Sequence, residues 1–351
     1  MNSDVYERLA QALDRLPNGF PRTESGVELQ ILKKIFSLEE ALIASNMTGT
    51  METANVIADR VNLPEEDVET KLREMLEREI IWGSKKDGTQ RFRLAPYFVG
   101  LWESQREALD HELAHLCEQY WLEGGAEGIM RYEPALHRVV PAYQALKTEY
   151  ILPYDDIKPL ILEAKSFEVR DCICRKQKDL VNDRKCDFPL RICFDFSPID
   201  RPANQYTITK EETLKLLDEA EEIGLVHTVR NVTHGVYYVC NCCGCCCGVL
   251  RGITEFGVEG GVAKANYYAV VDPEECTACG TCEDRCQVDA RHVEDDVSVI
   301  DLSKCIGCGI CVTGCPNEAV RLIRRPDAEI ISPPADFEAW EQERLRNRSL
   351  I

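Results

Sequence analysis

The order of apolar and polar residues over the first hundred positions predicts three helices followed by a hairpin. An apolar run with helical spacing covers residues 29–36, and a shorter helix covers residues 53–61. A third helix is expected from Pro64 to Glu79, because proline begins it, acidic residues fill its first turn and its apolar residues fall on one face. Strand-like residues on both sides of Asp87-Gly88, a strong turn dipeptide, predict the hairpin.

Farther along the chain, the same patterns predict more helices and one pair of strands. Residues 101–165 are expected to be mostly helical, and Thr209 with Glu212 forms a capping box that opens another apolar helix. Two strands follow, at residues 225–229 and 236–239. The second strand runs directly into a group of cysteines.

Length and charge narrow the classes of protein that fit this pattern. A chain of 351 residues predicts two or three domains. The 61 acidic and 41 basic residues give a formal charge of -20, so we do not expect binding to nucleic acid or anionic membranes. The chain has no long apolar segment and no apolar core of a signal peptide near its start, which predicts a cytoplasmic protein without a membrane span.

Nineteen cysteines are the most informative feature of the composition. Disulfides explain them poorly in a chain without an export signal, because the cytosol keeps thiols reduced. Cys117 stands alone in a helical pattern and is predicted to be a core residue. The other cysteines form two blocks, Cys172 to Cys247 and Cys276 to Cys315, for which metal or cluster ligation is the natural use.

The C-terminal block contains one cysteine spacing twice. The spacing C-x2-C-x2-C-x3-C occurs at Cys276, Cys279, Cys282 and Cys286 and again at Cys305, Cys308, Cys311 and Cys315. The flanking residues repeat at the same offset, with Val271-Asp272 corresponding to Ile300-Asp301, which predicts an internal duplication. Paired C-x2-C motifs also bind zinc, but three cysteines in a C-x2-C-x2-C run are a poor zinc pattern.

This region resembles the bacterial two-cluster ferredoxins. The resemblance implies two [4Fe-4S] clusters with crossed ligands, one bound by Cys276, Cys279, Cys282 and Cys315, the other by Cys305, Cys308, Cys311 and Cys286. Gly280, Gly307 and Gly309 are expected to let backbone N–H groups approach the sulfurs. Gln287 stands where this family usually has proline, which leaves ligation intact but makes that turn less rigid.

The first block supplies ten further candidate metal ligands. They are Cys172, Cys174, Cys186, Cys193, Cys240, Cys242, Cys243, Cys245, Cys246 and Cys247. Neighbouring side chains of an extended segment point to opposite faces, so adjacent cysteines are poorly placed for one corner of a cluster. This predicts either ligands divided between two clusters or one cluster of unusual form. The block is similar to a cysteine-rich segment of ferredoxin-fused proteins of anaerobes, a resemblance that implies no particular activity.

A basic stretch overlaps the start of the first block. Residues 170–191 contain seven basic and four acidic residues, although the whole chain is acidic. Arg and Lys near thiolate-bound clusters would stabilise the reduced state. The alternative is a solvated basic face with no such role.

The N-terminal order of helices and hairpin resembles a winged helix. Its third helix carries seven acidic and three basic residues, which would repel the phosphates of a major groove. Only the hairpin is basic, through Lys85, Lys86, Arg91 and Arg93. We therefore favour docking to a protein over binding to DNA.

These features predict a multidomain α+β protein. The expected parts are a winged-helix-like docking domain at 1–100, a helical connector and cysteine-rich cluster domain at 101–265, a ferredoxin-like domain with two [4Fe-4S] clusters at 266–330 and a tail helix at 331–351. One or two further iron-sulfur clusters are expected in the cysteine-rich domain.

The predicted function is electron transfer, as a protein or subunit that relays single electrons to or from a partner oxidoreductase. The partner is expected to contain a flavin or a metal, because no G-x-G-x-x-G follows a strand in this chain. We assign no catalytic residue and expect an electron-transfer subunit rather than a stand-alone enzyme. Two alternatives stay open: an iron-sulfur redox-sensing winged-helix regulator, and a reductase whose substrate binds an unusual cluster at Cys240 to Cys247.

Overall fold

The computed structural model describes residues 2–146, 151 and 153–351, and in it the chain forms two compact units. The first unit contains Met1–Tyr132, Gln177–Asp183 and Glu341–Ile351, and the second contains Glu133–Lys176 and Arg184–Trp340. The four-part division expected from the sequence stays a prediction. None of the helices in the described part of the chain combines the length and the apolar character needed to cross a membrane.

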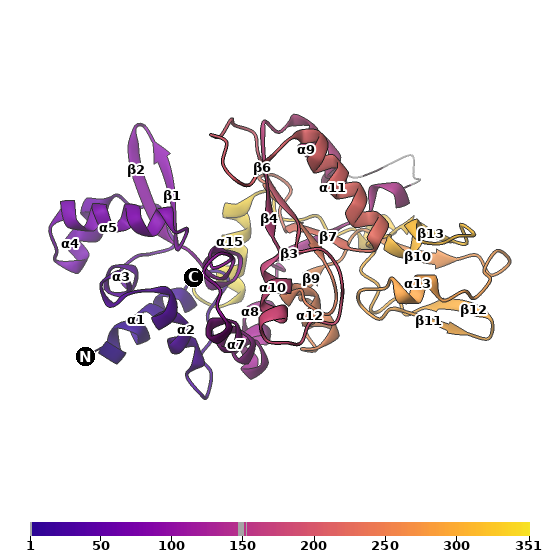
Figure 1. The fold of residues 1–351 in the computed structure, drawn as a ribbon, viewed down its shortest axis with the longest axis horizontal. Coiled ribbons are helices and arrows are strands. Elements are labelled where there is room, and N and C mark those ends of the chain that lie inside the picture. Colours follow the sequence, from indigo (N-terminus) through magenta and orange to yellow (C-terminus); the bar gives the residue numbers. More distant parts are fainter. Residues whose placement is uncertain (1, 147–150, 152) are drawn as a thin grey trace. The chain divides into compact units, whose positions relative to one another are not determined.

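The first unit is mainly helical, and a β-hairpin follows its first helices (Figure 1). Its elements are α1 (Asn2–Asp14), α2 (Val27–Ile35), α3 (Leu38–Ala44), α4 (Ala54–Val61), α5 (Glu65–Glu77), β1 (Ile81–Lys86), β2 (Thr89–Leu94), α6 (Trp102–Ser104), α7 (His111–Tyr120), α8 (Ala126–Met130) and most of α15 (Phe337–Asn347). The three predicted helices are α2, α4 and α5. The sequence analysis missed α3, which a capping box between Ser37 and Glu40 begins.

The hairpin forms where the turn dipeptide predicted it. Asp87 and Gly88 both have positive φ, 51° and 79°, as a two-residue turn that matches the twist of its strands requires. The strands pair antiparallel from Ile81 opposite Leu94 to the turn. Cys117 is buried in the core of this unit, as predicted.

The C-terminal helix α15 is anchored to the first unit through Arg344. Its guanidinium is fully buried and donates hydrogen bonds to the carbonyl oxygens of Pro17 at 2.9 Å, Ile129 at 2.6 Å and Tyr132 at 2.5 Å. One side chain therefore satisfies three backbone acceptors from two segments that lie far apart in the sequence.

The second unit is built on a seven-stranded sheet with the order β6-β4-β5-β8-β7-β3-β9. All neighbours are antiparallel except β3 and β9. The elements up to this sheet's last strand are β3 (His137–Val140), α9 (Lys158–Glu163), β4 (Ser166–Asp171), α10 (Ile173–Leu180), β5 (Arg191–Ser197), β6 (Thr207–Ile208), α11 (Lys210–Ile223), β7 (Val226–Arg230), β8 (Tyr238–Cys242), α12 (Gly248–Thr254) and β9 (Val262–Ala263).

The rest of the second unit is a smaller α+β module with two strand pairs. It contains β10 (Tyr267–Val271), α13 (Thr281–Asp284), β11 (Arg291–Glu294), β12 (Val297–Ile300), α14 (Ile310–Thr313) and β13 (Val320–Arg324). The outer strands β10 and β13 pair with each other, and β11 pairs with β12 (Figure 1). The ends of the module are thus held together while its loops extend between them.

The sequence analysis was right about α11 and missed β3. The capping box at Thr209 and Glu212 is present, and Gly224 ends α11 in the left-handed conformation. The strand pair predicted after it is β7 and β8. Residues 101–165 were expected to be mostly helical, but His137–Val140 form a strand that is buried along its whole length. So short a segment, whose first two residues are polar, carries no helix or strand periodicity.

Replacing Arg344 tests its anchoring role. Arg344→Met removes three hydrogen bonds and leaves buried carbonyl oxygens without donors, so it should lower the free energy of unfolding of the first unit by about 3 kcal/mol. Arg346→Met is the matched control, because Arg346 is exposed on the same helix and should change stability by less than about 0.5 kcal/mol. Urea denaturation followed by tryptophan fluorescence measures both. Equal effects of the two substitutions would contradict the anchoring role.

Candidate metal centres

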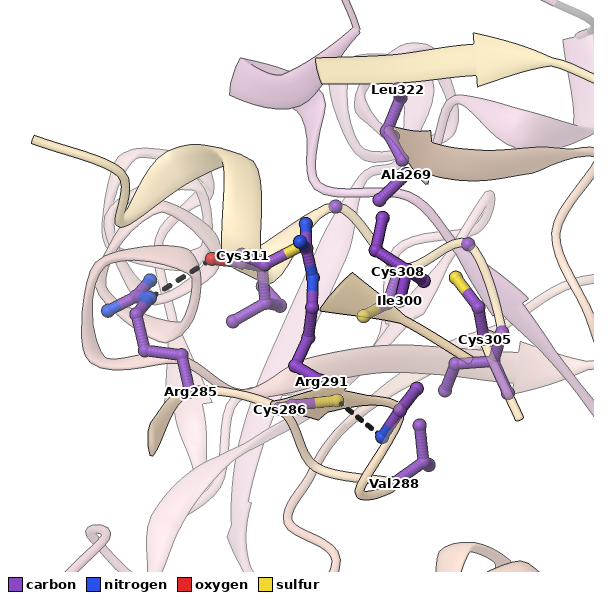
Figure 2. Close-up of a pocket in the computed structure, with 15 residues that line it drawn as sticks. Ala269, Arg285, Cys286, Val288, Arg291, Ile300, Cys305, Cys308, Cys311 and Leu322 are labelled. Carbon is purple, nitrogen blue, oxygen red and sulfur yellow. Dashed lines mark hydrogen bonds between the residues drawn. The ribbon is translucent and has the colours of Figure 1, made fainter. Parts of the chain in front are cut away.

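Two cavities in the C-terminal module are each lined by four cysteines. Cys276, Cys279, Cys282 and Cys315 line the cavity that we name the first thiol pocket. Cys286, Cys305, Cys308 and Cys311 line the second thiol pocket, shown in Figure 2. In each pocket, three thiols come from one C-x2-C-x2-C loop and the fourth comes from the other half of the repeat.

Equivalent backbone contacts position the two loops. Cys276 N–H donates to Asp272 O at 3.1 Å in the first half, and Cys305 N–H donates to Asp301 O at 3.0 Å in the second. Each loop then enters a short helix through a glycine with positive φ, Gly280 before α13 and Gly309 before α14. The repeat in the sequence is therefore also a repeat in local structure.

Gly307 shows why a glycine is needed in the second loop. It has a φ of 73°, and a Cβ there would lie 2.3 Å from the carbonyl oxygen of Tyr267. The position that corresponds to it in the first loop is Ala278, which also has a positive φ, 52°. The close backbone approach excludes a side chain at Gly307, whereas the expected approach of backbone N–H groups to the sulfurs stays a prediction.

A buried arginine and a serine connect the two thiol pockets. The Arg291 guanidinium donates to Cys311 Sγ at 3.3 Å and to Ser298 Oγ at 3.1 Å. Ser298 Oγ in turn accepts from Cys282 Sγ at 3.1 Å. The sequence analysis did not single out either residue. Arg291 places a positive charge beside a thiol of the second pocket, and its hydrogen bonds reach the first.

Burial changes the acidity of thiols in the second pocket. Burial raises the pKa of Cys308 and of Cys311, and in Cys311 the nearby Arg291 opposes this effect. A buried thiol keeps its proton until a cation stabilises the thiolate. Metal binding in this pocket should therefore release protons and become weaker as the pH falls.

Comparison with known proteins gives the class of this module. A family model described as a 4Fe-4S binding domain matches the chain twice, at residues 269–292 and 298–321. No curated protein and no solved structure matches the chain. The two matches are consistent with a two-cluster ferredoxin module, and the all-cysteine donor sets of the two pockets fit [4Fe-4S] clusters.

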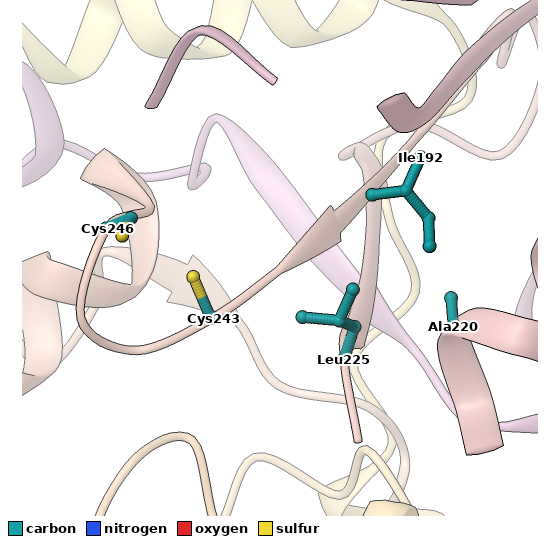
Figure 3. Packing of buried hydrophobic residues seen from close by; sticks show 5 residues of the cluster. All are labelled: Ile192, Ala220, Leu225, Cys243 and Cys246. Carbon is teal, nitrogen blue, oxygen red and sulfur yellow. The ribbon is translucent and has the colours of Figure 1, made fainter. Parts of the chain in front are cut away.

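The strand β8 sets the direction in which several side chains of the cysteine-rich block point. Cys240 and Cys242 share one face of the strand, while Asn241 points to the other, where its side chain hydrogen-bonds His227 at 2.6 Å. Cys243 is the first residue after the strand, two positions after Asn241, and it packs with Ile192, Ala220 and Leu225 (Figure 3). Cys242 and Cys243 belong to different groups of thiols, but the adjacent Cys245 and Cys246 have sulfurs 3.6 Å apart, so the expectation that neighbouring cysteines point apart fails for that pair.

Six of the ten thiols form what we name the six-thiol ring. The thiol of each member influences the pKa of two others, in the order Cys172, Cys174, Cys247, Cys242, Cys240, Cys193 and back to Cys172. The Cys242 and Cys247 sulfurs are 3.2 Å apart. Six sulfurs are more than one tetrahedral ion takes, so the ring offers ligands for several metal atoms.

The remaining four thiols, Cys186, Cys243, Cys245 and Cys246, form what we name the four-thiol group. Their sulfurs all lie within 4.8 Å of one another. Hydrogen bonds from Cys243 and Cys246 lower the pKa of Cys245 to about 4, whereas the hydrogen bond with Cys243, together with burial, raises the pKa of Cys186 to about 12. The pKa of Cys243 is also lowered, first by its interaction with Cys186, so the group favours the thiolate form at two of its members.

Arg175 is a basic residue that lies beside thiols of both groups. Its side chain is fully buried and donates to the carbonyl oxygens of Asn241 at 2.7 Å and Pro189 at 3.1 Å. Burial alone would lower its pKa, but the neighbouring thiols, Cys172 first among them, outweigh this effect and raise the pKa. Other basic residues of this stretch, such as Lys185, are exposed. The stretch thus contains both a buried residue beside thiols and exposed residues, and stabilisation of a reduced cluster by the former stays a prediction.

Gln287 connects the ferredoxin-type module to the cysteine-rich block. Its side chain accepts a hydrogen bond from Gly244 N–H at 2.9 Å and donates to Gly224 O at 3.0 Å. A Cβ at Gly244 would lie 2.2 Å from the Gln287 carbonyl oxygen, so the two turns are in direct contact. The departure from proline noted in the sequence supplies a side chain that proline lacks.

Neutralising Arg291 should shift one reduction potential. The positive charge of Arg291 lies beside Cys311 and stabilises the reduced, more negative state of the cluster. Arg291→Gln removes this charge, so the midpoint potential of the second pocket's cluster should fall by on the order of 60 mV. Arg321→Gln is the control, because Arg321 is exposed on β13. Potentiometric titration followed by EPR measures both variants. An unchanged midpoint in Arg291→Gln would contradict this role.

Substituting Cys286 tests the origin of the fourth ligand. Cys286 precedes the second C-x2-C-x2-C loop in the sequence but lines the second thiol pocket together with that loop. Cys286→Ser should therefore perturb the EPR signal of the cluster at Cys305, Cys308 and Cys311. Cys315→Ser is the reciprocal control and should perturb the other signal. If each substitution damages the cluster nearest to it in the sequence, the grouping is wrong.

Proposed function

We propose that this chain is an iron-sulfur electron-transfer protein, or a subunit, that relays single electrons to or from a partner oxidoreductase. The observation that carries the proposal is the buried connection between the two thiol pockets through Arg291 and Ser298. A [4Fe-4S] cluster accepts and returns one electron at a time. The chain holds two such sets of ligands in one module and joins them by hydrogen bonds.

The chain's own residues support a relay rather than isolated sites. Arg291 stabilises negative charge beside Cys311, and burial excludes water from that side chain. Arg285 joins the C-terminal module to α11. Its guanidinium donates to Glu221 O and Glu222 O of α11 at 2.8 Å and to Ile310 O of α14, within the module, at 3.0 Å. Gln287 adds the contact with Gly244, which lies between thiols of the four-thiol group.

We further propose that the six-thiol ring holds another iron-sulfur cluster. Its donors are all sulfur, and Arg175 provides a buried positive charge beside them. The Arg175 guanidinium also supports the carbonyl oxygen of Asn241, which lies between two members of the ring. The ring, the two pockets and these contacts all belong to the second unit.

The charges of the first unit support docking to a protein over recognition of DNA. Both basic residues within α5 are ion-paired to acids of the same helix, Lys71 to Glu74 at 2.7 Å and Arg73 to Glu69. On the hairpin, Arg93 is buried and ion-paired to Glu341, so it adds nothing to an exposed basic surface. Lys85 and Lys86 remain exposed, and we propose that they contact the partner.

One observation supports the reductase as a second candidate. A buried row of polar groups leads away from the six-thiol ring: Cys242 Sγ lies 3.4 Å from Thr228 Oγ1, which lies 3.3 Å from His137 Nδ1. His137 Nε2 is 2.9 Å from the Tyr238 hydroxyl, and burial lowers the pKa of His137 to about 3. A neutral imidazole in such a row is suited to passing protons to a substrate at the ring.

Anaerobic redox titration of the purified chain tests the electron-transfer function. The two thiol pockets should hold about eight iron atoms with matching acid-labile sulfide, and the six-thiol ring should raise the count further. The protein reduced by an artificial donor should then pass electrons one at a time to a one-electron acceptor, without consuming a small substrate.

Three outcomes would overturn this assignment. Zinc in place of iron at the two pockets would exclude electron transfer by the module. Turnover of a small substrate by the isolated chain, lost in Cys242→Ser, would favour the reductase. Enrichment of a defined duplex from a random DNA pool, lost on oxidation, would favour the regulator.

A further inference from the structure

The four-thiol group is a compact set of four sulfur atoms. The Sγ atoms of Cys186 and Cys243 are 3.9 Å apart, those of Cys186 and Cys246 are 3.8 Å apart, and those of Cys245 and Cys246 are 3.6 Å apart. The sulfurs of the remaining pairs also lie within 4.8 Å of one another. Four donor atoms this close together can all bind one central ion.

These distances match the requirements of a single metal ion. Zinc binds thiolates tetrahedrally at about 2.3 Å, which places neighbouring sulfurs about 3.8 Å apart. In a [4Fe-4S] cluster each cysteine binds a different iron atom, so the ligand sulfurs must lie farther apart than around one ion. The spacing within the four-thiol group therefore fits one ion and is too short for a cubane.

The two thiol pockets of the same chain provide an internal comparison. The four-thiol group is the one set of three or more possible ligands in the described part of the chain whose donor atoms all lie within 4.8 Å of one another. The thiols of the first and second pockets, where the 4Fe-4S family model matches, stand farther apart. The six-thiol ring also differs, because its six sulfurs do not all lie within 4.8 Å of one another.

The surroundings of the four-thiol group suit a structural ion. Three ligands lie on the turn after β8, and Gln287 holds this turn through Gly244. The fourth, Cys186, comes from the loop that joins α10 to β5, far away in the sequence. All four positions are filled by protein thiols, which leaves no open position for a substrate, as in closed zinc sites.

We propose that Cys186, Cys243, Cys245 and Cys246 bind one Zn²⁺ ion in a tetrahedral site that is separate from the iron-sulfur clusters. The ion fastens the loop that contains Cys186 to the turn after β8. Zinc has no redox chemistry, so this site positions the cysteine-rich block and carries no electrons. The ten thiols then divide into four for zinc and six for the cluster.

Metal analysis of the intact protein tests the proposal. Protein produced with both iron and zinc supplied and purified anaerobically should contain about one zinc per chain besides its iron. Cys245→Ser should lose most of this zinc and keep its iron. Two controls should show the reverse: Cys242→Ser in the six-thiol ring and Cys279→Ser in the first thiol pocket should lose iron and keep zinc.

X-ray absorption at the zinc edge on the unaltered protein makes the test independent of the folding of variants. Four sulfur neighbours at about 2.3 Å would support the proposal. A protein without zinc, or one whose zinc has nitrogen or oxygen neighbours, would overturn it. Loss of iron and acid-labile sulfide from Cys245→Ser would instead show that the four-thiol group holds a cluster, and loss of iron without sulfide would show a single iron ion.

Discussion

The alternation of side chains along β8 is the constraint on which the cysteine-rich block depends. A strand sends successive residues to opposite faces of its sheet, so Cys240 and Cys242 point one way and Asn241 and Cys243 the other. β8 lies in the middle of the sheet, between β5 and β7. Each of its faces therefore meets cysteines from other segments, and the consecutive thiols of this run are distributed between two separate groups.

Concentrating so many thiols in one unit requires buried positive charge. Thiolates are costly to bury unless cations or hydrogen-bond donors accompany them. Arg175 serves the cysteine-rich block and Arg291 the ferredoxin-type module, and both guanidinium groups are largely removed from water. Each also has a second task, since Arg175 holds backbone carbonyls and Arg291 holds Ser298. The same contacts therefore stabilise the fold and set the electrostatics of the sites.

The contact between the ferredoxin-type module and the cysteine-rich block holds the thiol sites of these two parts next to each other. Arg285 and Gln287 lie on either side of Cys286, a thiol of the second pocket, and both reach across to the end of α11 or the turn after β8. Gln287 follows Cys286 of the second pocket in the sequence and contacts Gly244, which lies between Cys243 and Cys245 of the four-thiol group. A structural ion in that group would hold one side of this contact rigid, which benefits electron transfer because donor and acceptor distances stay constant.

The sequence by itself determined the features that depend on near neighbours: the repeated cysteine spacing, the Asp87-Gly88 hairpin and the capping box of α11. These follow from interactions within a few residues and do not need the rest of the fold. Only the tertiary structure decided which of the ten thiols group together, that β3 is a strand, and that Arg291 and Gln287 hold the sites. Those outcomes depend on sheet register and packing between segments far apart in the chain, which no local pattern encodes.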